Sequence, residues 1–84
     1  MAGLWNMPRF FFHVRNGLGE LSRDLLGLDF ADVETAYREA IRAAGELGGN
    51  FAARGQNPGD YVIEAVNTSG EVVFTLPFSQ VLHH

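Results

Sequence analysis

Cysteine is absent from this chain, and lysine is absent too, because all six basic residues are arginine. Without cysteine there is no disulfide framework, no thiolate nucleophile and no cysteine-ligated metal, so a hydrophobic core or a partner must supply the stability. No apolar run approaches the ~20 residues that cross a bilayer, and no secretory signal is visible. We therefore expect a cytoplasmic protein that has no membrane partner.

Positive charge is scarce. Ten acidic residues outnumber the six arginines, which are scattered along the chain, and the formal net charge is −4. Because attraction to phosphate backbones depends on clustered basic residues, we expect no duplex DNA among the partners. No phosphate-binding glycine loop that ends in Gly-Lys-Ser/Thr occurs, so we expect neither a nucleotide nor any other cofactor.

The rest of the composition is typical of one globular domain. Hydrophobic residues make up 46% of the chain and charged residues only 19%, which is too few for a self-repelling, disordered chain. A chain of 84 residues can support only one core. We place this domain at residues 8–82 and interpret residues 1–7 as a flexible N-terminal extension.

The densest aromatic run, at residues 8–15, is predicted to be a central strand. Side chains alternate between the two faces of a strand, so this run has a core face and an outer face. The core face holds Phe10, Phe12 and Val14, and the outer face holds Arg9, Phe11, His13 and Arg15. An Asn-Gly reversal then leads to a short second strand at residues 20–24, and residues 25–30 are predicted to form an apolar loop.

One amphipathic helix is predicted to begin at Asp32, whose carboxylate can accept a hydrogen bond from the amide of Glu34 or Thr35. Apolar residues recur after it at the three- and four-residue spacing of a helix face. They are Val33, Ala36, Tyr37, Ala40, Ile41, Ala44, Leu47 and Phe51. Because glycine weakens a helix interior, the helix should end between Gly48 and Gly55.

Two further strands are predicted to flank the turn at residues 67–70, and two registers compete. A three-residue loop would set Glu64 beside Phe74, whereas a four-residue loop would pair Val66 with Glu71. We favour the four-residue loop because it keeps the Glu64 carboxylate out of the core. Its core face then holds Tyr61, Ile63, Ala65, Val72, Phe74 and Leu76.

The order strand, strand, helix, strand, strand predicts an α+β domain with a four-stranded, mainly antiparallel sheet and one helix on one face. The first strand is expected to pair with the third in the centre. Pro77 cannot donate to a sheet, so the last strand should end there, and the tail should fold back through Phe78, Val81 and Leu82. The predicted core consists of Phe10, Phe12, Tyr37, Ile41, Ile63 and Phe74.

Several stretches of the chain also carry a resemblance. They are Met7-Pro8-Arg9-Phe10-Phe11-Phe12-His13-Val14, Asp24 with Gly27, Asp32-Val33-Glu34 with Ala36, Glu39 and Ala40, and Gly70 with Leu76-Pro77-Phe78-Ser79. Over about residues 7–82 the chain resembles a family of short alphaproteobacterial proteins of unknown function, whose members open Met-Pro-Arg-Tyr-Phe-Phe-His. The resemblance implies a bacterial source and no catalytic residues. The chain departs from the family in residues 1–6 and in the pair Gly48-Gly49.

His13 is the only histidine inside the predicted domain, and an imidazole can act as an acid or base near neutral pH. However, the sequence contains no Ser-His-Asp, Cys-His, His-x-x-x-His or HExxH arrangement. We therefore interpret His13 as a hydrogen-bonded sheet residue and expect no enzymatic activity.

The candidate metal ligands are equally sparse. Asp24, Asp29 and Asp32 lie in a glycine-containing stretch, but their spacing differs from that of a calcium-binding loop, so capping and turn roles are expected for them. His83-His84 at the tail could hold a metal only weakly, and we predict no metal site.

The outer face of the first strand is the sharpest functional candidate. Arginine and aromatic side chains on an open sheet face are how several single-stranded RNA modules stack bases, so single-stranded nucleic-acid binding is the alternative function. The acidic total and the predicted positions of Glu64 and Glu71 on the neighbouring hairpin weigh against it.

A single helix can cover only one face of a four-stranded sheet, and an uncovered apolar patch marks an interaction site in a soluble protein. We therefore predict a protein-interaction or regulatory module that forms a homodimer or binds a protein partner. The candidate interaction face consists of Phe11, His13, Arg15, Val62, Val66 and Val73. The tail from Phe78 to Leu82 is the competing cover for this face.

We expect the protein to bind neither mononucleotides nor duplex DNA, because it lacks a phosphate loop and carries a net charge of −4. Fluorescence anisotropy with labelled nucleotides, duplex DNA and random single-stranded RNA checks this. Salt-sensitive micromolar binding to the RNA that Phe11→Ala abolishes would favour the nucleic-acid alternative instead.

Overall fold

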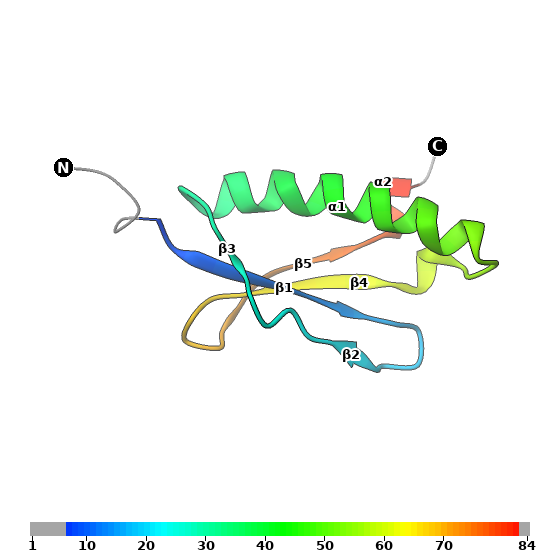
Figure 1. Ribbon diagram of the computed structural model, residues 1–84, viewed down its shortest axis with the longest axis horizontal. Helices are drawn as coiled ribbons and strands as arrows, with labels where there is room; N and C mark the ends of the chain where they lie inside the picture. The colour runs from blue at the N-terminus through cyan, green and yellow to red at the C-terminus, as the bar shows by residue number, and fades with distance from the viewer. Residues whose placement is uncertain (1–6, 83–84) are drawn as a thin grey trace.

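One long helix lies across one side of a twisted antiparallel sheet in the computed structural model, which describes residues 7–82 (Figure 1). The elements are β1 (Arg9–Arg15), β2 (Leu21–Ser22), β3 (Leu28–Asp29), α1 (Val33–Ala53), a 3-10 turn (Pro58–Asp60), β4 (Val62–Val66), β5 (Val72–Pro77) and α2 (Ser79–Leu82). The predicted α+β class is confirmed. Most of the predicted N-terminal extension and the His83-His84 pair lie outside the described residues.

The sheet is built around β1. Its order is β2-β1-β4-β5, and β1 pairs with β4 along five residues from Phe11 to Arg15, as the predicted central pairing of the first and third strands requires. The opposite edge of β1 is shared by β2 near Arg15 and by β3 near Arg9. The sheet therefore has five strands rather than four, because the stretch predicted to be a loop contributes β3.

The boundaries of α1 confirm the predicted helix. Asp32 is the N-cap, and its carboxylate accepts a hydrogen bond from the Thr35 amide at 2.7 Å, which satisfies a free donor of the first turn. The helix ends at Ala53, and Gly55 follows with a φ of +79°, in the left-handed region that favours glycine.

Small residues form the line of contact between α1 and the sheet. Ala36, Ala40 and Ala44 are completely buried, and Gly48 continues the same line one turn further on. We call these four residues the alanine stripe. The stripe lies over a core that includes Ile63, Leu76 and Phe78, so methyl groups rather than large side chains set the distance between helix and sheet.

The predicted core is wrong at two positions on α1. Tyr37 and Ile41 remain 36% and 38% exposed. Each follows a stripe residue directly, and because each helical residue turns by about 100°, its side chain lies on the flank of the helix. Of the other predicted core residues, Phe10 and Ile63 are buried, and Phe12 and Phe74 pack against the core.

The register predicted for the β4–β5 hairpin is also wrong. The Asn67 N–H donates to the Glu71 carbonyl at 3.0 Å, so the loop has three residues rather than four. A bulge beside Ala65 and Val66 then shifts the pairing, and Glu64 lies opposite Thr75 instead of Phe74. Glu64 is thereby kept out of the core, as the prediction required, although by a bulge instead of a longer loop.

The bulge also changes the face on which Val72 lies. Val72 pairs with Val66 and is 54% exposed, so its predicted place on the core face is wrong. Beyond the bulge, Ile63 pairs with Leu76 and Ala65 pairs with Phe74, which keeps these residues on the helix side.

The tail folds back on the helix side of the sheet, not on the opposite side. Phe78 is completely buried, and its ring lies parallel to that of Phe51 at 6.0 Å. In α2, the Leu82 side chain packs so closely on Gly48 that a Cβ there would lie 2.6 Å from it. The tail therefore does not cover the candidate interaction face.

Phe78 anchors this arrangement, and Phe78→Ala should lower the free energy of unfolding by about 3–5 kcal/mol, because it leaves a large cavity between the helix and the tail. Urea denaturation measures the change. The exposed neighbour Gln80 provides the control, and Gln80→Ala should leave the unfolding midpoint unchanged. A similar midpoint for both variants would show that the tail contributes nothing to the core.

Candidate functional site

The sheet face turned away from α1, here called the outer face, brings together most of the predicted interaction residues. In the pairing of β1 with β4, Phe11 lies opposite Val66, His13 opposite Glu64, and Arg15 opposite Val62. Val73 occupies the bulge and has no paired residue opposite it. All six predicted residues are half-buried, so none projects freely into solvent.

The loop between β2 and β3 contributes to this burial. Its Gly27 has a φ of +69°, and a Cβ there would lie 2.8 Å from Cε2 of Phe11 and 2.9 Å from the Phe10 carbonyl oxygen. Only glycine allows the backbone to approach the Phe11 ring so closely. The outer face is therefore less apolar at its surface than the sequence suggested.

Both arginines that β1 presents on the outer face are held by carboxylates. Arg15 Nε donates to Glu64 at 2.6 Å, and Arg9 Nε donates to Asp29 at 2.8 Å. The hydrogen bond from Arg15 lowers the pKa of Glu64. The hydrogen bond from Arg9 likewise lowers the pKa of Asp29. The positive charge of the predicted nucleic-acid strip is therefore neutralised within the chain.

Asp24 closes a gap in the sheet. Between β2 and β3 the edge of β1 has no strand beside it, and there the Asp24 carboxylate accepts the Phe12 N–H at 3.1 Å. The same carboxylate accepts the amides of Leu26 and Gly27 at 3.1 and 3.0 Å. Asp24 thus has the turn role that the sequence predicted, together with that of a missing strand.

His13 is part of the same cluster. Its Nδ1 accepts the backbone N–H of Asp24 at 3.0 Å, so the ring carries its proton on Nε2. Burial alone would raise the pKa of Asp24, but the amides of Gly27, Phe12 and Leu26 hold it below its usual value. His13 is the hydrogen-bonded sheet residue that the sequence predicted.

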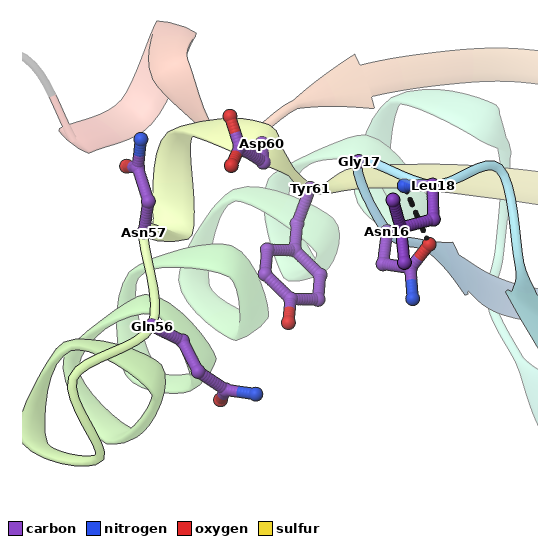
Figure 2. A pocket seen from close by; sticks show the side chains of 7 residues that line it. All are labelled: Asn16, Gly17, Leu18, Gln56, Asn57, Asp60 and Tyr61. Carbon is purple, nitrogen blue, oxygen red and sulfur yellow. Dashed lines mark hydrogen bonds between the residues drawn. The ribbon is translucent and has the colours of Figure 1, made fainter.

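Two clefts lie at the far end of the molecule, near the end of β1. One, of about 490 Å³, is lined by Asn16, Gly17, Leu18, Gln56, Asn57, Asp60 and Tyr61. Figure 2 shows the Tyr61 ring between the segment of residues 16–18 and the segment of residues 56–57. The other, of about 440 Å³, shares Asn16 and Tyr61 and is lined mainly by apolar side chains such as Leu47 and Phe51. His13 lines neither cleft, and the first contains no histidine or arginine.

A second apolar surface lies along α1, and two of its three residues, Tyr37 and Ile41, were predicted to lie in the core. Val33, Tyr37 and Ile41 are 46%, 36% and 38% exposed and recur every four residues. We call these three residues the α1 flank. The sequence contained a signal for this exposure. The smallest residues of a helix permit the closest packing, so Ala36 and Ala40 mark the side that faces the sheet, and Tyr37 and Ile41 are rotated away from that side.

Two other findings concern binding chemistry. Among residues 7–82, no group of three or more histidines and acidic residues is placed to hold a metal ion. Within the same residues, no helix combines the length and the apolar character that a membrane span needs.

The carboxylate of Asp24 should make stability depend on pH. Because its pKa in the folded chain is lowered, its stabilisation is present above the unfolded value of about 4 and is lost as the pH falls through the folded value. Asp24→Asn should lower the urea midpoint at neutral pH, and its further fall on acidification should be smaller than that of the wild type.

The exposed Asp60 offers a matched control, because Asp60→Asn removes the same charge without disturbing the edge of β1. The urea midpoints of Asp60→Asn should match those of the wild type at neutral pH and after acidification. If Asp24→Asn loses as much stability on acidification as the wild type does, the carboxylate is not the group responsible.

Comparison with known proteins identifies the family of this chain. One family profile, described as a domain of unknown function (DUF6894), matches residues 9–79. The match spans the sheet, α1 and the start of α2. No curated protein and no solved structure gives a significant match. In agreement with the resemblance seen in its sequence, the chain belongs to DUF6894, a family of domains of unknown function.

Proposed function

We propose that this domain is a cytoplasmic protein-interaction module that pairs with a second copy of itself, and that it is not an enzyme. The observation that carries the proposal is the α1 flank, whose three apolar side chains remain 36–46% exposed and whose Tyr37 ring contacts Phe74 of β5. Apolar side chains that cluster on a small domain gain free energy when a partner removes them from water.

The position of α2 supports the proposed self-association, because α2 leaves the α1 flank exposed. The short α2 helix packs on the C-terminal half of α1, where Val81 approaches Gly45 and Leu82 approaches Gly48. Among the described residues, no helix covers the α1 flank, and the outer face is covered only in part, where the loop of Gly27 packs on Phe11. Within residues 7–82, α2 therefore covers the C-terminal half of α1 and not the α1 flank.

The contacts of His13 support a binding module over an enzyme. Its Nδ1 is occupied by the Asp24 amide, and its place on β1 is opposite Glu64 within the sheet, away from both clefts. A general base needs a free nitrogen within reach of a bound substrate.

The ion pairs of the outer face argue against the nucleic-acid alternative. Binding of a phosphate backbone by Arg9 or Arg15 would first have to displace Asp29 or Glu64, and the displaced carboxylate would repel the phosphate. No observation on the outer face favours this alternative.

Self-association is tested by light scattering on the intact chain across the micromolar range. We expect the mass to rise towards twice that of the monomer at tens of micromolar. The rise should persist at high salt, since burial of apolar surface drives it. A chain that remains monomeric at every concentration contradicts the proposed function.

A further inference from the structure

The free edge of β5 is the starting point. In the described sheet, β5 pairs only with β4 and forms one end of the strand order. The Phe78 N–H donates to the Tyr61 carbonyl, and bonded pairs alternate along antiparallel strands, so Leu76 and Phe74 bond towards β4. The backbone N–H and C=O of Thr75 between them therefore point away from the sheet, where another strand can bind.

The α1 flank contacts this same strand through Tyr37. The Tyr37 ring meets the Phe74 ring edge to face, with 5.1 Å between centroids. Figure 1 shows α1 and β5 running in the same general direction. The free backbone of Thr75 and the half-exposed ring of Tyr37 thus belong to one surface, which a single partner can cover.

This surface is complementary to itself. Val33 and Ile41 are each four residues from Tyr37, so an antiparallel copy of the helix centred at Tyr37 brings Val33 of each chain against Ile41 of the other. A two-fold axis at that level also passes near Thr75, because Tyr37 stands over Phe74. A single two-fold axis can therefore pair the two β5 edges and the two α1 flanks at the same time.

Charge does not oppose the contact. Arg38 borders the α1 flank and is paired with Glu34 at 3.4 Å on its own helix. The border of each copy is thus neutral, and apposition brings no uncompensated like charges together.

We infer that a second copy of this chain adds to the free edge of β5 in antiparallel orientation, with the two-fold axis beside Thr75 and the two α1 flanks packed against each other. This rests on the proposed function and names its interface. The contact is a single strand edge and three side chains per copy, at the low end of the sizes of specific interfaces, so a micromolar dissociation constant is expected.

Two features confine this pairing to one register. Pro77 lacks the N–H that a longer ladder would need, and the bulge beside Val66 distorts the other end of the strand. The straight part centred at Thr75 remains. Because a two-fold contact uses the same surface on both copies, assembly stops at the dimer.

A single introduced cysteine tests the geometry cleanly, because the natural chain contains none. Directly opposed residues of a bonded antiparallel pair have Cα atoms about 5.5 Å apart, within the range of a disulfide. Under mild oxidation at tens of micromolar, Thr75→Cys should form at least about tenfold more covalent dimer than Asn50→Cys, whose exposed position on α1 is away from the flank. Phe11→Cys reports on the outer face in the same way.

A second pair of variants tests the flank without any cross-link. Ile41→Glu places a charge in the contact and should raise the dissociation constant at least about tenfold, whereas Asn50→Glu adds the same charge to the same helix and should not change it. Circular dichroism and urea midpoints show that each variant is folded.

The outcomes separate the two proposals. Efficient Thr75→Cys cross-linking together with weakening by Ile41→Glu supports the β5 interface. A dimer that cross-links through Phe11→Cys but not through Thr75→Cys overturns this interface and leaves the proposed function intact. A monomer at all concentrations overturns both.

Discussion

The close approach of α1 to the sheet is the constraint on which the rest of this structure depends. It is possible because the residues at the contact are Ala36, Ala40, Ala44 and Gly48, which present a methyl group or less. Tyr37 and Ile41 each follow one of these small residues in the helix, so their side chains lie on the flank and remain 36% and 38% exposed. The same constraint gives α2 its seat, because Leu82 packs directly on Gly48. The small residues of the alanine stripe thus affect both the packing of the core and the exposure of the α1 flank.

Side-chain hydrogen bonds and ion pairs hold the sheet together where its regular strand pairing is interrupted. On the edge of β1 opposite β4, the strands β2 and β3 have only two residues each, and the gap between them is filled by the Asp24 carboxylate, which accepts three backbone amides. Arg9 and Arg15 are fixed by Asp29 and Glu64 across the sheet. The charges of the outer face are therefore used to hold the fold together, which leaves little free charge there to attract a ligand.

The proposed function follows from which surfaces of the sheet and of α1 are packed against other elements and which remain exposed. The helix covers one face of the sheet, α2 covers the C-terminal half of the helix, and the loop of Gly27 partly covers Phe11. The α1 flank stays 36–46% exposed although Tyr37 contacts Phe74, and in the described sheet no strand pairs with the outer edge of β5. For a domain whose family has no known function, the uncovered surface is more informative than the two clefts, because it combines exposed apolar area with free backbone groups.

The sequence by itself determined the α+β class, the helix from Asp32, the end of β5 at Pro77 and the folded-back tail, because caps, periodicity and proline act through near neighbours. The central place of β1 was predicted from its dense aromatic run, and its pairing with β4 joins residues far apart in the chain. The sequence could also place Asp24 in a turn and His13 in the sheet. Only the tertiary structure decided the hairpin register, since a three-residue loop with a bulge and a longer loop both keep Glu64 out of the core. It likewise decided that Tyr37 and Ile41 lie outside the core, because periodicity shows which side of a helix is apolar but not how near that side lies to its partner.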